Sequence, residues 1–202
     1  HPAAEQQEAD SGTGNNKGTN TSAAKANSIT AKTSYTLTAS TKAQKLSLGA
    51  KAKGGTLTYV SNNKSVKVNA SGKVTIPKNF VGKAVITITA KGSGYQTTTK
   101  KVTITVNPAG VKLKTLENVK KNKLKVTWGK NKKADGYEIR YSLKSSFKSA
   151  KTVRVAGASN KTKTIAKLKK GKKYYVTIRT YKKVGGKLYY SGWSAKKNIK
   201  IT

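Results

Sequence analysis

Residues 123–142 read KLKVTWGKNKKADGYEIRYS and contain two runs in which large apolar residues alternate with polar ones. The apolar residues recur at every second position: Leu124, Val126 and Trp128, then Tyr137, Ile139 and Tyr141. A period of two places these side chains on one face of a β-strand. The segment therefore predicts two half-buried strands joined by a polar loop.

The same alternation extends over the rest of the chain from residue 29, and no segment keeps a 3.6-residue period. In residues 29–107 the apolar positions are Tyr35, Leu37, Ala39, Leu46, Leu48, Ala50, Leu57, Tyr59, Val66, Val68, Val74, Ile76, Ala84, Ile86, Ile88, Ala90, Val102, Ile104 and Val106. After Trp128 and Tyr141 they are Val153, Val155, Ile165, Tyr174, Val176, Ile178 and a run from Trp193 to Ile201. Each half predicts about seven strands, typical of an antiparallel sandwich. The chain is predicted to be all-β, with two tandem antiparallel β-sandwiches.

The polar residues between these apolar positions are expected on the solvated faces of their strands. In the second half they are Lys123, Lys125, Glu138, Arg140, Thr177 and Arg179. Glu138 in particular is expected to point outward beside Tyr137.

The domain boundaries follow from changes in composition. Residues 1–28 contain no Leu, Ile, Val, Phe, Tyr or Trp, so a disordered tether is predicted there. Pro108 cannot donate to a strand ladder, which predicts a linker at 108–110. The two sandwiches are then expected at 29–107 and 111–202. The chain does not begin with Met, and we expect a processed or excised fragment.

The composition excludes most catalytic chemistry. The chain has 43 Lys plus Arg against 6 Asp plus Glu, no Cys, and one His at position 1. Disulfides, thiol catalysis, Cys/His zinc sites and His acid–base chemistry are therefore excluded. After residue 10 the acids are Glu117, Asp135 and Glu138, which we expect to be solvated or paired with Lys. We predict no enzyme, no cofactor and no metal, and the sequence has no apolar run of the roughly 18 residues that a membrane span needs.

The first half then resembles a known family. The segments YVSNNKSVKVNASGKVTI, VGKAVITITA and KKVTITV, within residues 58–106, resemble the bacterial Ig-like domain of the group 2 type. The family's pattern falls on residues 61–63, 66–68, 72, 74–76 and 82–88. Tyr59 replaces the Trp that is usual in this pattern. The resemblance implies an Ig-like sandwich.

Residues 111–202 resemble a fibronectin type III domain. The matching features are Trp128 at the end of strand B, YEIRY (137–141) as strand C, and LKKGKKY (168–174) before strand F. The resemblance implies a tyrosine corner, in which the Tyr174 hydroxyl bonds the backbone a few residues upstream. A Lys-rich Ig-like and type III tandem is similar to repeats of surface or secreted proteins of low-GC Gram-positive (clostridial) bacteria. That similarity implies a secreted or bacterial cell-surface location.

On a type III fold the lysines gather at two ends. The distal lysine patch, at the end away from the first sandwich, comprises Lys120, Lys121, Lys123, Lys144, Lys148, Lys167, Lys169, Lys170, Lys172 and Lys173. The proximal lysine patch, in the B–C and F–G loops, comprises Lys130, Lys132, Lys133, Lys182, Lys183 and Lys187. A formal charge of +37 attracts polyanions. The competing interpretation is a solvated coat that reflects codon composition, although codon bias should also supply Glu.

The basic residues also limit the choice of partner. Only Arg140, Arg154 and Arg179 carry the guanidinium fork that reads guanine edges, so nucleic acid is expected to bind nonspecifically and at low salt. Four tyrosines could stack on bases, but cross-strand packing is the favoured interpretation for them. They are Tyr175, Tyr181, Tyr189 and Tyr190.

Two functions follow from the sequence. The first is a non-catalytic extracellular adhesion or spacer module that binds anionic cell-wall polymer, such as teichoic acid, or host glycan through its lysines. The alternative is a secreted, irisin-like type III signalling polypeptide that engages a host receptor.

Overall fold

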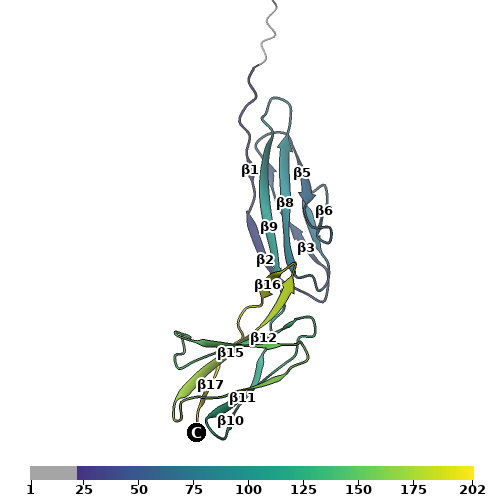
Figure 1. The fold of residues 1–202 in the computed structure, drawn as a ribbon. Coiled ribbons are helices and arrows are strands. Elements are labelled where there is room, and N and C mark those ends of the chain that lie inside the picture. The colour runs from purple at the N-terminus through teal and green to yellow at the C-terminus, as the bar shows by residue number, and fades with distance from the viewer. Residues whose placement is uncertain (1–21) are drawn as a thin grey trace, which may run out of the picture.

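The computed structural model describes residues 22–202, which form two β-sandwiches, one beyond the other along the chain (Figure 1). These residues contain 17 strands, β1 to β17, and no helix. The predicted all-β class is confirmed. Accordingly, the described part of the chain has no helix that could cross a bilayer.

The first sandwich has two main sheets, beside a short two-stranded sheet. The larger has the order β2 (Ser34–Thr38), β9 (Thr98–Asn107), β8 (Gly82–Lys91) and β5 (Thr56–Ser61). The smaller has the order β3 (Gln44–Ser47), β7 (Lys73–Ile76) and β6 (Lys67–Val68). Alternate residues of β8 and β9 are buried between the sheets, as a period of two requires.

One strand pair departs from the predicted antiparallel arrangement. β2 runs parallel to β9, with Ser34 opposite Thr103 and Thr38 opposite Asn107. Alternation in a sequence shows which face of a strand is buried, but not which neighbour it pairs with or in which direction. The first strand of the large sheet therefore runs beside the last one, in the same direction.

The predicted tether overlaps the folded structure. Residues 1–21 lie outside the described part of the chain, but the backbone N–H of Lys25 donates to Gly94 O at 2.9 Å, and Lys25 O accepts from Gln96 N–H at 2.8 Å. The Asn27 side chain donates from Nδ2 to Gly54 O and accepts the Gly54 N–H at Oδ1. The prediction was wrong for these residues, because hydrogen bonds rather than apolar burial hold them. Two short strands missed from the sequence, β1 (Ile29–Thr30) and β4 (Lys51–Ala52), pair immediately after them.

The turn before β7 requires glycine at position 72. The φ of Gly72, +80°, lies in the left-handed region, and a Cβ there would stand 2.7 Å from the ring of Tyr59. Tyr59 lies on β5, at the position where the resemblance implied Trp. The glycine therefore lets the turn before β7 close over this aromatic ring.

Two sheets also make up the second sandwich. One has the order β10 (Leu113–Val119), β11 (Lys123–Trp128) and β14 (Thr162–Ile165). The other has the order β13 (Lys151–Ala156), β12 (Gly136–Ser142), β15 (Lys173–Val184) and β16 (Lys187–Tyr190), and β17 (Lys197–Lys200) also pairs with β15. Trp128 and Tyr137 lie in the core between the sheets, with ring centroids 5.3 Å apart.

A β-bulge interrupts the last edge of this sandwich, where the sequence predicted a run from Trp193 to Ile201. Ser191 N–H donates to Thr180 O and Ser194 N–H donates to Ile178 O, so two residues, Gly192 and Trp193, lie opposite Arg179 alone. The hydroxyls of Ser191 and Ser194 accept the N–H groups of Thr180 and Ile178. These hydroxyls replace the carbonyls that a regular ladder would supply.

The tyrosine corner implied by the resemblance is present. Tyr174 is buried, and its hydroxyl accepts the backbone N–H of Lys169, five residues upstream, at 3.0 Å. This bond fixes the crossing between β14 and β15.

We expect Tyr174→Phe to lower the free energy of unfolding of the second sandwich by about 1 to 2 kcal/mol, because it removes this bond and little volume. Urea unfolding should show a lower midpoint at an unchanged m-value. The matched control is Tyr175→Phe, a half-exposed neighbour whose hydroxyl makes no hydrogen bond within residues 22–202. Equal effects of the two substitutions would contradict a structural role for the corner.

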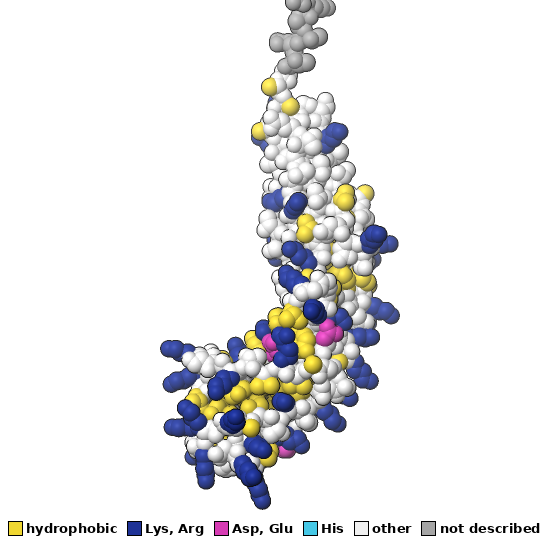
Figure 2. Space-filling view, in the orientation of Figure 1, with side chains coloured by type: hydrophobic (Ala, Val, Ile, Leu, Met, Phe, Trp, Pro, Cys, Tyr) yellow, Lys and Arg dark blue, Asp and Glu magenta, His cyan; other side chains and the backbone are white. Residues whose placement is uncertain are grey.

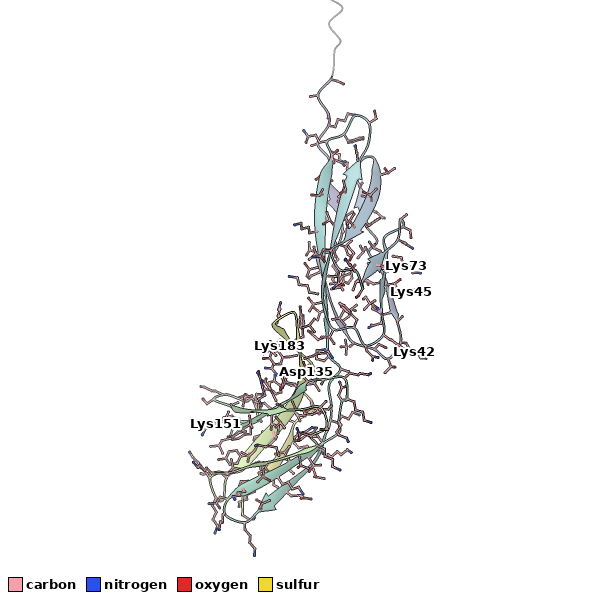
Figure 3. All side chains as sticks on the ribbon, turned by 45° about the vertical axis from the view of Figure 1, so that its right-hand side comes forward. Lys42, Lys45, Lys73, Asp135, Lys151 and Lys183 are labelled. Carbon is pink, nitrogen blue, oxygen red and sulfur yellow. The ribbon has the colours of Figure 1, made fainter. Side chains whose placement is uncertain are left out.

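The residues between the sandwiches are held by the second one. Ala109 O accepts hydrogen bonds from Asn131 Nδ2 and Thr180 Oγ1, both at 2.8 Å. Lys183 and Asp135 lie at this junction (Figure 3). A cavity of about 80 Å³ is lined from both sides, for example by Val81 of the first sandwich and Asn131 of the second.

Candidate anion-binding surfaces

The distal lysine patch is assembled from three loops of the second sandwich. Leu168 N–H donates to Asn122 O at 3.1 Å, which joins the β10–β11 turn to the β14–β15 turn. The β12–β13 loop meets the β14–β15 turn at a pocket of about 350 Å³. Lys123 is half-buried, and the other nine lysines of this patch are exposed. The fold thus brings together loops that are far apart in sequence.

This pocket, the distal pocket, combines cationic and hydroxyl groups. Its lining includes Lys151, Lys167 and Lys169, with Tyr141 and Ser149. Burial, and then the neighbouring Tyr174, raise the pKa of Tyr141, so its hydroxyl stays protonated at neutral pH. Ammonium and hydroxyl groups around one hollow can donate several hydrogen bonds to an oxyanion.

The proximal lysine patch lies at the opposite end, near the first sandwich. Lys182 Nζ donates to Lys133 O at 2.9 Å, and the backbone N–H of Lys183 donates to Asp135 Oδ2 at 2.7 Å. Lys187 Nζ lies 5.4 Å from the ring centroid of Tyr189. Protein groups therefore already engage part of this patch.

Few of the cationic groups have a carboxylate partner. Within residues 22–202, the ion pairs are those that Glu138 makes with Arg154 and Arg179. Glu117 and Asp135 are exposed. No group of three or more His, Cys, Asp or Glu that could hold a metal occurs in the same residues. Figure 2 shows Lys and Arg side chains projecting from both sandwiches, with acidic side chains at few places.

Glu138 does not point into solvent, and that prediction was wrong. It is 5% exposed, and each of its carboxylate oxygens accepts two N–H groups from one arginine. Arg154 Nη2 lies 2.6 Å from Oε2, and Arg179 Nη2 lies 2.7 Å from Oε1. Thr177, also expected on a solvated face, is 1% exposed, with its hydroxyl 2.6 Å from Ser194 O.

Aromatic rings lie over the arginines on this face of the sheet. Trp193, placed by the bulge, lies 4.3 Å from the guanidinium carbons of both Arg140 and Arg179. Phe147, from the β12–β13 loop, lies 4.1 Å from Arg140. Tyr190 lies 3.8 Å from Arg179. We call these rings and the three arginines, with Glu138, the arginine face.

The electrostatics of the arginine face are unbalanced. Burial alone would raise the pKa of Glu138, but hydrogen bonds from Arg154 and Arg179, with their charges, hold it below its ordinary value. Burial, and then the charge of Arg179, lower the pKa of Arg140. The arginine face holds three guanidinium groups and one carboxylate, which pairs with Arg154 and Arg179, so Arg140 is without an ionic partner in the described chain.

The tyrosines considered for base stacking are engaged within the protein. Tyr181 and Tyr189 are buried, and Tyr181 lies 4.7 Å from the guanidinium carbon of Arg154. Tyr190 stacks on Arg179, and Tyr175 has Lys196 Nζ 5.9 Å from its ring centroid. The packing interpretation accounts for Tyr181 and Tyr189, whereas Tyr175 and Tyr190 are half-exposed.

Sequence reasoning missed Phe147 and Trp193 as parts of a surface. Phe147 lies in an irregular loop at a φ of +60°, where no strand period applies. The arginines themselves could have pointed to this face. The chain has a large excess of lysine, yet its three arginines lie on adjacent strands.

Comparison with protein families identifies the second sandwich. Residues 107–196 match the family model of the fibronectin type III domain. These residues are therefore a fibronectin type III domain, a class of module that is typically non-catalytic and commonly extracellular. No curated protein matches the chain in sequence.

Solved structures resemble the chain at low sequence identity. A structure described as "Myokine structure" is 17% identical, with a TM-score of 0.37, over 46% of this chain and 95% of its own. The FN1–FN3 domains of chicken CNTN1 are 14% identical, with a TM-score of 0.42, over 89% and 68%. A cytokine receptor complex is 12% identical, with a TM-score of 0.49, over 86% and 96%.

Proposed function

We propose that this chain is a non-catalytic extracellular module of a bacterial surface or secreted protein, and that it adheres to anionic cell-wall polymer or host glycan. Its first sandwich would be the bacterial Ig-like domain of the group 2 type. In this role the first sandwich spaces the fibronectin type III domain from the rest of the protein, and the distal lysine patch binds the polymer.

The observation that carries this proposal is the distal pocket, where the β12–β13 and β14–β15 loops bring Lys151, Lys167 and Lys169 together without a carboxylate among the lining residues. If codon composition alone explained the lysines, we would expect them to be spread over the surface and not to gather around a pocket. Unpaired ammonium groups release counterions when a polyanion displaces them, which favours binding at moderate salt.

The test compares two variants of equal charge change. One is the distal variant, with Lys169, Lys170, Lys172 and Lys173 replaced by Gln. The other is the proximal variant, with Lys130, Lys132, Lys133 and Lys187 replaced by Gln. At 150 mM salt we expect the distal variant to bind teichoic acid at least about tenfold more weakly, and the proximal variant to change less. The salt dependence of the distal variant should become shallower by roughly 0.7 to 0.9 log units per decade of salt for each phosphate that its side chains no longer neutralise.

Equal decreases in affinity in the two variants, or binding that does not respond to salt, would contradict the proposal. Saturable binding to a single host-cell protein at 150 mM salt, unchanged in the distal variant, would instead favour the secreted signalling polypeptide.

A further inference from the structure

The arginine face has a feature that the lysine patches lack. The chain's basic side chains are almost all lysine, and all three arginines lie on one face of the β13–β12–β15 sheet. Glu138 stands directly opposite Arg154 on one neighbouring strand and Arg179 on the other. Arg140 is two positions along β12, so it lies on the same face, outside this pairing.

Glu138 has no capacity left for Arg140. Its Oε2 accepts Nε and Nη2 of Arg154, and its Oε1 accepts Nε and Nη2 of Arg179. Each oxygen of the carboxylate is thus bound by the guanidinium group of one arginine. Three positive charges and one negative charge leave a formal surplus of +2 on this face, and Arg140 is the member without a counter-ion in the described chain.

The structure holds Arg140 in a fixed orientation. Its guanidinium carbon lies 4.1 Å from the Phe147 ring and 4.3 Å from the Trp193 ring. Its Nε is enclosed and has no hydrogen-bond partner in the described chain, while the side chain as a whole is partly exposed. The accessible part is therefore the Nη end, which presents two parallel N–H groups.

The surroundings of Arg140 suit a polymer with repeated negative charges. The β12–β13 loop that carries Phe147 also carries Lys144 and Lys148, both exposed. Beyond Trp193, Lys196 is exposed, and its Nζ donates to Ser145 O of that loop at 3.2 Å. Lys144, Lys148 and Lys196 thus lie on the two segments that carry the rings against the Arg140 guanidinium.

We propose that Arg140 is a discrete binding site for a carboxylate of an acidic glycan, which it would hold end-on through its two Nη groups. A planar guanidinium matches the two coplanar oxygens of a carboxylate, and a bidentate pair is stronger and more directional than an interaction with an ammonium. The site goes beyond the proposed function, because its specificity comes from one oriented fork rather than from the lysine charge.

The first test uses the three arginine Nε–H signals of the ¹⁵N-labelled full chain. On addition of hyaluronan tetrasaccharide at 150 mM salt, we expect saturable shifts of the Arg140 signal and of the Trp193 indole N–H. The signal of Arg154, which Glu138 already engages, should stay in place. Absence of a saturable shift at Arg140 would overturn the proposal.

The second test uses a substitution that keeps the positive charge at position 140 but removes the guanidinium group. We expect Arg140→Lys to bind the tetrasaccharide at least about tenfold more weakly, as the loss of one charge-assisted hydrogen bond requires. Arg154→Lys is the matched control on the same face and should bind within about twofold of the parent. Thermal unfolding of both variants confirms that they are folded. Unchanged binding in Arg140→Lys would overturn the site, since charge alone would then be sufficient.

Two further probes define the ligand. A poly-glutamate peptide that shifts the Arg140 signal at concentrations where the tetrasaccharide does not would overturn the assignment to a glycan. A sulfated disaccharide that binds more tightly than the tetrasaccharide would overturn the assignment to a carboxylate. The distal lysine variant should retain the Arg140 shift, so failure of the proposed function and failure of this site give different results.

Discussion

Replacing Glu138 with Gln is expected to lower the free energy of unfolding of the fibronectin type III domain by about 2 to 4 kcal/mol. Removal of one partner from a buried ion pair costs about 3 to 5 kcal/mol, because the other charge is left uncompensated. The side chains of Arg154 and Arg179 are 44% and 25% exposed, so water compensates part of that loss. Both tryptophans lie in this domain, so their fluorescence during urea unfolding reports on it alone.

The control for this substitution is Glu117→Gln, which changes an exposed acid in the same domain and should alter stability by no more than about 0.5 kcal/mol. An effect of Glu138→Gln as small as that of the control would mean that the pair behaves as an ordinary surface salt bridge.

The same carboxylate makes stability depend on pH. The pKa of Glu138 is lower in the folded protein than its ordinary value of 4.5, so the unfolded chain binds the proton more readily. Its contribution is therefore fully present above about pH 5 and is lost as the pH falls through the folded pKa. The stability difference between the parent and Glu138→Gln should shrink below about pH 4. A difference that grows in acid would contradict the sign of the shift.

Replacing Trp128 with Ala is expected to cost about 3 to 5 kcal/mol, the largest effect predicted for this chain. Trp128 is 1% exposed and packs against Tyr137, so its removal leaves a cavity between the two sheets. The loss approaches the whole stability of a small domain. Circular dichroism should show the type III domain unfolding first, while the first sandwich, which has a separate core, remains folded.

The informative comparison is Trp128→Phe. The indole N–H of Trp128 is buried without an acceptor in the described chain, so phenylalanine loses volume but no hydrogen bond. We expect a cost of about 1 to 2 kcal/mol. If the two substitutions cost the same, the site tolerates a cavity and the packing argument is wrong.

Much of the fold follows from local pattern. Alternation places Leu124, Val126 and Trp128 on the buried face of β11, and the type III resemblance of the residues before β15 implied the tyrosine corner. The assignment of the lysine loops to the two ends of the sandwich rested on the strand order that the type III resemblance implies. For the strand faces, the determining information lies within a few residues.

The errors concern interactions between distant segments. Glu138 follows the alternation of an outward-facing residue, but Arg154 and Arg179 from the two neighbouring strands bind its carboxylate, and Trp193 lies over Arg179. A period of two identifies the face of a strand and cannot show whether another segment lies on that face. The parallel pairing of β2 and the hydrogen bonds of Lys25 depend in the same way on partners distant in the sequence.

The parallel pair of β2 and β9 has a mechanical consequence. The chain enters the large sheet of the first sandwich along β2 and leaves along β9, and the two strands point the same way (Figure 1). Tension between the chain's ends would slide one strand lengthwise past the other instead of peeling them apart. The hydrogen bonds along five paired residues would then share the load, so the sheet would be strained in shear along its strands.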